Sequence, residues 1–227
     1  MEHATTPNRV ALELESVARD AAGCTACGLA ATRTQTVAGE GSPTAQILFV
    51  GEAPGAREDL AGRPSVGASG RLLDGLLASI GLRREEVFIL NTVKCRPPDN
   101  RNPQKSETSA CAPFLNRQIQ ALQPRIIATL GRHALAVFAP TANISEVHGR
   151  PYTQTEGSQH AGAVLFPLYH PAAALHNGSM RPTLERDMAA LRAYLDAGTR
   201  EAAGEATLRE VDSVPTRPRS KRQGEAE

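Results

Sequence analysis

Tryptophan is absent from this chain of 227 residues, and aromatic side chains make up only 4% of it. A surface that holds many bases by stacking them on aromatic rings is therefore not expected. An excess of one charge is also lacking, since 25 Lys and Arg against 24 Asp and Glu leave a net charge of +1. Any nucleic-acid partner would have to bind a local patch rather than a uniformly basic surface.

Long apolar runs are missing as well, and no stretch approaches the roughly 20 apolar residues of a membrane-spanning helix. The first ten residues, MEHATTPNRV, lack the basic start and the apolar core of a secretory signal. We therefore expect a cytoplasmic protein with no membrane partner. A hydrophobic content of 41% and a charged content of 22% are typical of a globular domain with a substantial core.

Short apolar runs alternate with segments of helical periodicity along most of the chain. The runs are residues 46–50, 87–90, 125–130 and 163–168, and the expected helices are residues 8–22, 70–80, 107–122, 133–138 and 182–195. This alternation predicts an α/β fold, a three-layer α/β/α sandwich with a central four-stranded parallel sheet. Residues 139–161 are expected to hold loops and an edge hairpin. The predicted domain spans residues 1–197, and residues 198–227, poor in large apolar side chains, are predicted to be a disordered tail.

A glycine-rich segment follows the first apolar run. Residues 51–74, GEAPGAREDLAGRPSVGASGRLLD, contain five glycines and are expected to form a long loop before the next helix. Glycine permits close approach of a ligand to the backbone, and loops at strand ends in α/β sheets commonly meet the substrate. Glu52 and Glu58 in this loop are therefore candidate site residues. The alternative is a plain connection with solvated acidic side chains.

The chain has four cysteines, of which Cys24 and Cys27 form a C-x2-C pair, with Cys95 and Cys111 farther along. A reducing cytoplasm disfavours disulfides, so this set indicates a metal site. Four thiolates suit zinc or an iron–sulfur cluster, and the spacing does not choose between them. The alternative is four unrelated buried thiols.

Three loop motifs occur in a fixed order together with these cysteines: GEAPGAREDLAGRPSVG at residues 51–67, NTVKCRPP at 91–98 and YHPAAAL at 169–175. Together they resemble the family-four uracil-DNA glycosylases, the iron–sulfur branch of that superfamily, over roughly residues 20–197. The resemblance implies a DNA repair enzyme that hydrolyses the N-glycosidic bond of uracil and leaves an abasic site. It also implies a 4Fe-4S cluster on Cys24, Cys27, Cys95 and Cys111.

Cleavage of the bond between deoxyribose and uracil builds positive charge on the sugar and negative charge on the base. Catalysis therefore needs an anion near the sugar or its attacking water and a donor at the uracil oxygen, roles that the resemblance gives to Glu52 and His170. It gives the reading of the uracil edge to Asn91, whose amide offers both a donor and an acceptor. The remaining expected uracil-binding residues are Glu58, as a wall against the thymine methyl group, Ser65 and Gly51.

The target nucleotide must be flipped out of a duplex or come from single-stranded DNA. We expect a monomer that binds uracil-containing DNA. Cations near the second and third motifs are candidate phosphate contacts, although each could be solvated: Lys94, Arg96, Arg101 and Arg181. The resemblance also places Leu175 as a wedge in the gap left by the flipped base, with core packing as the alternative.

Two features depart from the family pattern. Ser65 stands where the family usually has a phenylalanine that stacks on uracil, a contact worth about 1–3 kcal/mol. His148 and His176 stand where arginines are common. These departures leave a second hypothesis open, an iron–sulfur protein that binds damaged DNA with weak or altered base specificity. A nucleotide hydrolase is disfavoured because the sequence has no GxxxxGK[ST] phosphate motif.

Overall fold

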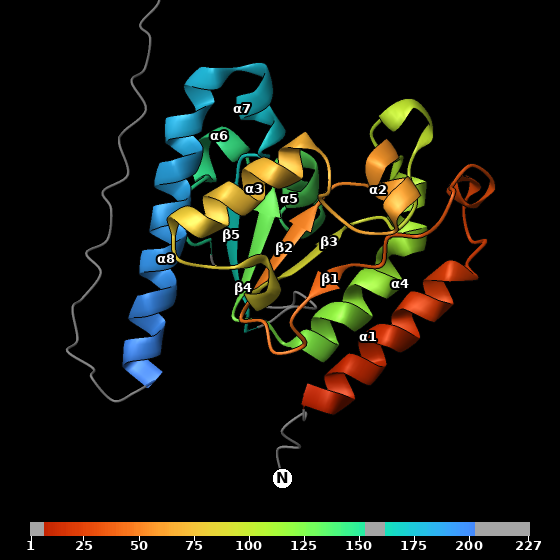
Figure 1. Cartoon of the computed structure of the whole chain (residues 1–227), viewed down its shortest axis with the longest axis horizontal. Helices are drawn as coiled ribbons and strands as arrows, with labels where there is room; N and C mark the ends of the chain where they lie inside the picture. The colour runs from red at the N-terminus through yellow and green to blue at the C-terminus, as the bar shows by residue number, and fades with distance from the viewer. Residues whose placement is uncertain (1–6, 153–161, 203–227) are drawn as a thin grey trace, which may run out of the picture.

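The computed structural model describes residues 7–152 and 162–202. Its strands form one mixed five-stranded sheet with the order β1-β3-β2-β4-β5 (Figure 1). The strands are β1 (Glu40–Gly41), β2 (Ile47–Gly51), β3 (Phe88–Asn91), β4 (Ile126–Leu130) and β5 (Val164–Leu168). The pairs β3–β2, β2–β4 and β4–β5 are parallel, whereas β1 pairs antiparallel with β3.

The α/β class is confirmed, but the predicted sheet of four parallel strands lacked the edge strand β1. This strand has only two residues, neither of them apolar enough to form a recognisable pattern, and Glu40 pairs with Ile89 through the backbone. Gly41 has φ +141°, and a Cβ there would stand 1.9 Å from the carbonyl oxygen of Val87. The strand therefore depends on close backbone approach, which hydrophobic periodicity does not report.

Eight α-helices lie in the described residues, and five of them were expected: four within two residues of their observed ends, and α8 with a predicted end seven residues too early. The eight are α1 (Pro7–Ala22), α2 (Ala56–Ala61), α3 (Ala68–Ser79), α4 (Lys105–Leu122), α5 (Arg132–Phe138), α6 (Ile144–Val147), α7 (Ala172–His176) and α8 (Arg181–Ala202). Short 3-10 helices occupy Gly28–Ala31, Arg84–Glu86, Pro98–Asn100 and Gly178–Met180. The sequence did not predict α2, α6 and α7, because helices of four to six residues are too short to show a period. The segment expected to be one long loop thus contains α2.

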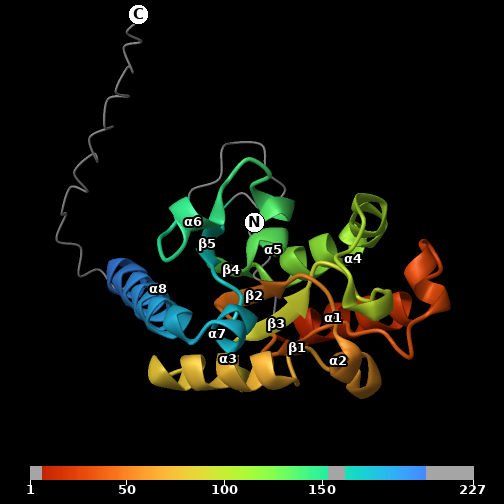
Figure 2. The same ribbon diagram turned by 90° about the horizontal axis from the view of Figure 1, so that it is seen from above.

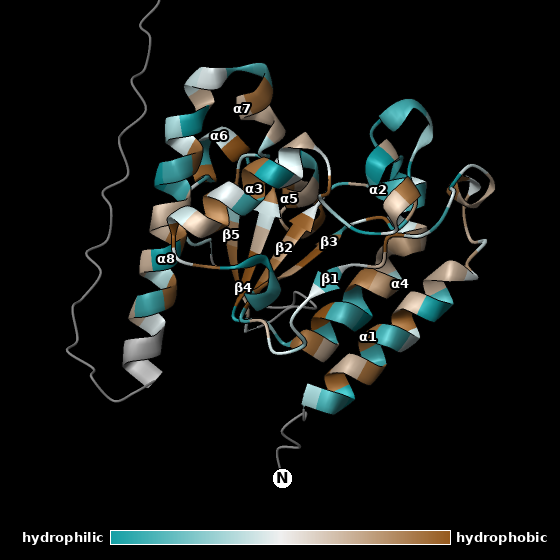
Figure 3. Ribbon diagram, in the orientation of Figure 1, coloured by the Kyte–Doolittle hydropathy of each residue, from teal (hydrophilic) through white to brown (hydrophobic). Residues whose placement is uncertain are grey.

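Apolar side chains pack on both faces of the sheet because neighbouring residues of a buried strand point to opposite sides. Ile47 and Phe49 of β2 pack with side chains of α3 and α8. Leu48 and Val50 pack with side chains of α1, α4 and α5 on the other face. Figure 2 shows α3 and α5 on opposite sides of the sheet. Figure 3 shows the central strands mainly in the brown of hydrophobic residues, whereas α1 and α8 carry both hydrophobic and hydrophilic residues.

The C-terminal helix extends farther than the predicted domain. Helix α8 continues to Ala202, so residues 198–202 are helical and the boundary placed at residue 197 was too early. The rest of the predicted tail lies outside the described residues. Of the expected edge hairpin, Tyr152 forms an isolated antiparallel bridge with Leu165, and residues 153–161 also lie outside the described part. None of the described helices is long and apolar enough to cross a membrane.

Candidate active site

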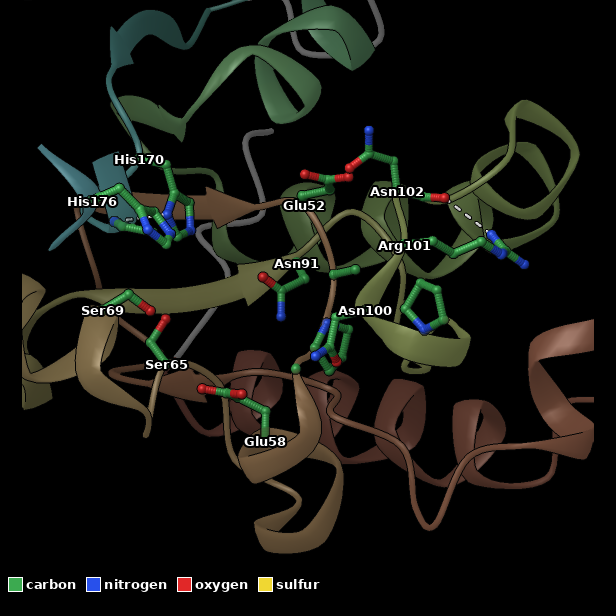
Figure 4. Close-up of a pocket in the computed structure, with 15 residues that line it drawn as sticks. Glu52, Glu58, Ser65, Ser69, Asn91, Asn100, Arg101, Asn102, His170 and His176 are labelled. Atoms are coloured by element: carbon green, nitrogen blue, oxygen red, sulfur yellow. Dashed lines mark hydrogen bonds between the residues drawn. The ribbon is translucent and has the colours of Figure 1, made fainter. Parts of the chain in front are cut away.

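The carboxyl ends of β2, β3 and β5 meet at one edge of the sheet, as parallel strands of an α/β fold do. Glu52 follows β2, Asn91 closes β3, and His170 comes two residues after β5. All three side chains line one cavity of about 620 Å³. Figure 4 shows Asn91 between Glu52 on one side and Glu58 with Ser65 on the other. The complete lining is Glu52, Ala53, Pro54, Gly55, Glu58, Ser65, Ser69, Asn91, Pro97, Asn100, Arg101, Asn102, His170, Ala172 and His176.

Glu52 has a fixed main chain and a buried carboxylate oxygen. Its carbonyl oxygen accepts hydrogen bonds from Thr92 Oγ1 at 2.6 Å and from the N–H of Val93 at 3.3 Å. Its buried Oε1 has no hydrogen-bond partner among the described residues. Burial raises the pKa of Glu52, and the charges of His133 and Arg132 oppose this rise. The main chain of Glu52 is therefore held in place while Oε1 stays available to water or a ligand.

The ring of His170 is oriented by the backbone that follows it. The N–H of Ala172 donates to His170 Nδ1 at 3.1 Å, so the proton of the neutral ring is assigned to Nε2. Burial lowers the pKa of His170, although the charge of Glu58 opposes this. Close packing adds a constraint, since a Cβ on Gly131 would lie 3.1 Å from His170 Cβ. The side chain is thus a neutral hydrogen-bond donor at neutral pH.

Asn91 is only 7% exposed, and its position depends on the glycine beside it. Gly51 of β2 pairs with Asn91 of β3 across the parallel ladder. A Cβ on Gly51 would stand 2.3 Å from Asn91 Oδ1, well inside contact distance. Gly51 therefore acts by leaving room for the Asn91 amide.

Glu58 and Arg84 hold the loop that carries Ser65. Glu58 Oε1 accepts from the N–H groups of Val66 and Gly67, both at 3.0 Å. Arg84 donates to the carbonyl oxygen of Ser65 at 3.3 Å and also to that of Pro64. Ser65 itself has φ +52°, a left-handed conformation that is uncommon for residues other than glycine. Glu58 thus has a structural role in addition to lining the cavity, and its contact with a thymine methyl group stays a prediction.

The prediction that Lys94 contacts DNA phosphate was wrong. Lys94 is 1% exposed, and its Nζ donates to the carbonyl oxygen of Asn91 at 2.9 Å. Sequence position alone placed this charge in a loop, whereas the fold turns its side chain inward beneath the end of β3. Its ammonium group supports the main chain of the cavity and cannot reach a phosphate outside.

The other predicted DNA contacts differ in their surroundings. Leu175 on α7 is 50% exposed, which rules out core packing and leaves it available as a wedge. Arg101 lines the cavity but pairs with Glu107 through two hydrogen bonds of 2.8 and 2.7 Å. Arg96 donates to Asn100 Oδ1 at 2.8 Å, and the exposed Arg181 donates to Glu185 Oε1 at 2.9 Å. Contacts of these arginines with phosphate stay predictions.

Several cavity residues were not among the predicted site residues. Ser69 lies in the first turn of α3, while Asn100 and Asn102 come from the segment after the second motif. That loop turns sharply, since Asp99 and Asn100 have φ of +54° and +53°. The polar run DNRN was the signal that could have indicated them. His176 was noted only as a departure from the family pattern, and it too lines the cavity.

The four cysteines line a second, smaller cavity that is separate from the first. Cys95 and Cys111 are buried, and three N–H groups donate to sulfur: Arg33 Nη1 to Cys95 and the Lys94 N–H to Cys111, each at 3.3 Å, and the Ala26 N–H to Cys24 at 3.4 Å. No three His, Cys, Asp or Glu side chains in the described ranges are grouped tightly enough to hold a single ion. A cluster has a different requirement, because its cysteines surround several irons instead of meeting at one ion. The arrangement of four thiols around one apolar cavity fits such a group.

Comparison with known proteins gives consistent matches over most of the chain. The family described as the uracil DNA glycosylase superfamily matches residues 38–195. A type-4 uracil-DNA glycosylase of Sulfurisphaera tokodaii is 46% identical over 185 residues, which cover 79% of this chain and 83% of that protein. Its counterpart in Saccharolobus solfataricus is 44% identical over 190 residues, covering 81% and 87%. A type-5 uracil-DNA glycosylase of Pyrobaculum aerophilum is 31% identical over 178 residues, covering 70% and 75%.

Proposed function

Because the chain belongs to the uracil DNA glycosylase superfamily, we propose that it hydrolyses the N-glycosidic bond of uracil in DNA and leaves an abasic site for repair. The observation that carries this proposal is the convergence of Glu52, Asn91 and His170 on one cavity. Each supplies a group that the reaction needs: an anion, an amide that reads a base edge, and a neutral donor.

In the proposed reaction, Asn91 recognises the base before the bond breaks. Its amide donates to uracil O4 and accepts from N3–H, whereas cytosine presents the opposite pattern at these positions. A buried polar site rejects the wrong edge because its own groups would then stay unpaired. Burial of Asn91 and the room left by Gly51 support this role.

His170 and Glu52 then act on opposite sides of the breaking bond. The electron pair of the bond between sugar C1′ and uracil N1 moves onto the base, and His170 Nε2–H donates to O2 as negative charge builds there. The sugar gains positive charge, which the Glu52 carboxylate stabilises while it orients a water molecule. That water forms the new bond to C1′ and releases a proton to Glu52 or solvent. No covalent enzyme intermediate is required.

The proposal is tested with an oligonucleotide that contains one uracil, followed by alkali, which cleaves the strand at an abasic site. We expect cleavage at the uracil position and no cleavage with cytosine or thymine there. If the protein binds the uracil strand without turnover, and Glu52→Ala and His170→Ala leave binding unchanged, the alternative of a damage-binding iron–sulfur protein replaces this one.

We also propose that Cys24, Cys27, Cys95 and Cys111 hold a 4Fe-4S cluster. The four thiols lie around one cavity, where the cluster would join the chain after α1 to the loop after β3 and to α4. Its role in this proposal is to stabilise these segments, with no part in bond cleavage. Arg101 and the loop from Pro97 to Asn102 lie between two of the cysteines in sequence, so loss of the cluster would also disturb the cavity wall.

For the cluster, we expect purified protein to contain about four irons per chain and to absorb visible light. Cys111→Ala is expected to remove most of the iron and to lower the melting temperature by about 5 °C or more, because bound metal contributes directly to folding. Iron analysis and thermal unfolding measure this. Zinc in place of iron in anaerobically purified protein would contradict the assignment.

A second prediction concerns Gly51→Ala. The added methyl group would displace the Asn91 amide, and a small displacement in a site can reduce the rate by about tenfold to a hundredfold. We expect this loss in single-turnover excision with little change in melting temperature. Gly75→Ala provides the matched control, since a Cβ on Gly75 would meet nothing within 4 Å. Equal rates for both variants would argue against the placement of Asn91.

A third prediction concerns Ser65→Phe, which restores the ring that the family usually carries. Stacking on the base is worth about 1–3 kcal/mol, and Ser65 already has the left-handed backbone that phenylalanine would have to adopt. We expect the half-saturating concentration of uracil DNA to fall by about tenfold, less than the full stacking energy allows. Measurement of rate against enzyme concentration in single-turnover conditions tests this. Tighter binding of undamaged DNA by the same factor would show that the ring does not contact the uracil.

The same proposal places DNA across the mouth of the cavity. Leu175 would occupy the gap left by the flipped nucleotide, and Arg96 and Arg181 are the cations we assign to flanking phosphates.

A further inference from the structure

A histidine–aspartate pair outside the cavity, His148 with Asp187, lies beside the end of β5, just before His170, and is called the clasp below. His148 follows α6, and its Nδ1 lies 2.8 Å from Oδ2 of Asp187 on α8. The side chain of Asp187 is 8% exposed and that of His148 is 26% exposed, so the pair is largely shielded from solvent. Neither residue lines the cavity. The pair therefore cannot act by touching a bound base.

The imidazole of His148 also contacts the residue that precedes His170. Its ring centroid lies 4.5 Å from that of Tyr169, with the two planes inclined by 44°. Aromatic pairs at this separation have a preferred mutual orientation. A shift of His148 would thus be transmitted to Tyr169, and Tyr169 shares a peptide bond with His170.

Gly149 fixes the same turn to β5 and to Asp187. Its N–H donates to the carbonyl oxygen of Pro167 at 2.9 Å. Its φ is +70°, and a Cβ there would stand 2.3 Å from Asp187 Oδ1. The buried carboxylate therefore lies directly against the backbone of the turn. Three contacts, with Asp187, Tyr169 and Pro167, hold this short segment against the end of β5.

We propose that His148 and Asp187 are positioning residues for His170, which they hold in place through Tyr169 and the end of β5. This inference rests on the proposed function, in which His170 donates to the departing base. On the other side of the strand end, the N–H of Gly131 donates to the carbonyl oxygen of Leu168 at 2.8 Å. The clasp and this bond together flank the two residues before His170.

The charges around the clasp make it sensitive to the identity of residue 148. Asp187 faces His148 across the turn, and the charge of Arg186 on the same helix also acts on the Asp187 carboxyl group. Tyr169 packs against the His148 ring. On the turn segment, Arg150 donates to the carbonyl oxygen of Glu146, and the Glu146 carboxylate accepts from Asn143 Nδ2. Burial raises the pKa of Asp187, and its hydrogen bond with His148 opposes this. A buried carboxylate is costly to leave unpaired.

The test compares single-turnover uracil excision by the full chain and by the variants His148→Gln and Asp187→Asn at neutral pH. Asp20→Asn is the matched control, since Asp20 forms an ion pair with Arg117 that is remote from β5. We expect Asp187→Asn and His148→Gln to lower the saturating rate by about tenfold to a hundredfold with little change in half-saturation.

A second readout does not depend on activity. Hydrogen exchange of the Ala172 amide, which donates to His170 Nδ1, reports the position of that ring directly. Asp187→Asn should speed this exchange by about tenfold and leave the amides of α4 unchanged, while Asp20→Asn should change neither. Unchanged exchange at Ala172 in both Asp187→Asn and His148→Gln would overturn the inference. If the wild-type protein excised no uracil but exchange responded as described, the clasp would stand and the proposed function would fail.

Discussion

His170→Asn is expected to lower the rate of uracil excision by about 10²- to 10³-fold, the usual effect of removing one donor that stabilises developing negative charge. Asparagine can still place an oxygen near the position of Nδ1 and accept from the N–H of Ala172. It has no donor at the position of Nε2. The substitution therefore separates the catalytic donor from the local structure, and the melting temperature should change little. Single-turnover kinetics at saturating enzyme measures the effect.

His170→Gln is the matched control for this substitution. Glutamine carries an amide N–H2 close to the position of the histidine Nε2, so it should retain more of the rate than asparagine does. An Asn variant that excises uracil within about threefold of wild type would show that another group supplies the donor.

The depressed pKa of His170, caused by its burial, also predicts a pH effect on stability. A group whose folded pKa lies below its unfolded value favours the folded state fully above the unfolded pKa, here about 6.5. That contribution is lost as the pH falls through the folded pKa. The wild-type protein should therefore lose stability on acidification in a window that starts near this value, and His170→Asn should lose less. Chemical unfolding at several pH values compares the two.

Glu52→Gln is expected to reduce excision by about 10²- to 10⁴-fold, since it removes the anion that stabilises the sugar and orients the water. The size and shape of the side chain are almost preserved. In the wild-type protein the rate should fall on acidification at a higher pH than an ordinary glutamate would produce, because burial raises the pKa of Glu52. The rate of Glu52→Gln should not show this fall on acidification. In Arg132→Gln the fall should occur at still higher pH, because the charge of Arg132 opposes the rise in the Glu52 pKa.

Stability should move in the opposite direction to activity in Glu52→Gln. A carboxyl group with a raised folded pKa stabilises the fold below its unfolded pKa of 4.5, and this contribution is lost as the pH rises through the folded value. Neutral glutamine avoids the cost of burying a charged carboxylate. We expect the melting temperature of Glu52→Gln to equal that of the wild type or to lie a few degrees above it near neutral pH. The difference between the two melting temperatures should decrease on acidification. A large loss of stability would instead indicate a structural role for Glu52.

The positions of β2, β3, β4 and β5 along the chain were predictable from local sequence pattern. Buried parallel strands form continuous apolar runs, as in Ile47–Gly51 and Ile126–Leu130, and each predicted run lies within one residue or two of an observed strand. The edge strand β1 was not predictable, since Gly41 lies there because of its neighbour Val87 and not because of any pattern around it. Short helices such as α2 were not predicted, because they are too short to show a helical period.

The site residues likewise divide into those that the sequence could identify and those that only the structure shows. Glu52 could be proposed from its place in a glycine-rich loop after an apolar run, where an α/β sheet places its ligands, whereas Asn91 and His170 were proposed from the family resemblance of their motifs. Lys94 could not be assigned correctly, since nothing in its sequence neighbourhood shows that its ammonium group turns inward to the carbonyl of Asn91. The clasp of His148 and Asp187 joins residues 39 positions apart, and only the packing of α8 on β5 brings them together.

The sequence by itself determined the α/β class, the three motifs at strand ends and the set of four cysteines. Residue type and spacing are enough to indicate which strands are buried and which side chains can bind a ligand. The tertiary structure decided which side chains share a cavity, which charge is buried, and that Gly51 makes room for Asn91. Those properties depend on distances between segments far apart along the chain. Such distances are set only when the strands pair into a sheet and the helices pack on it.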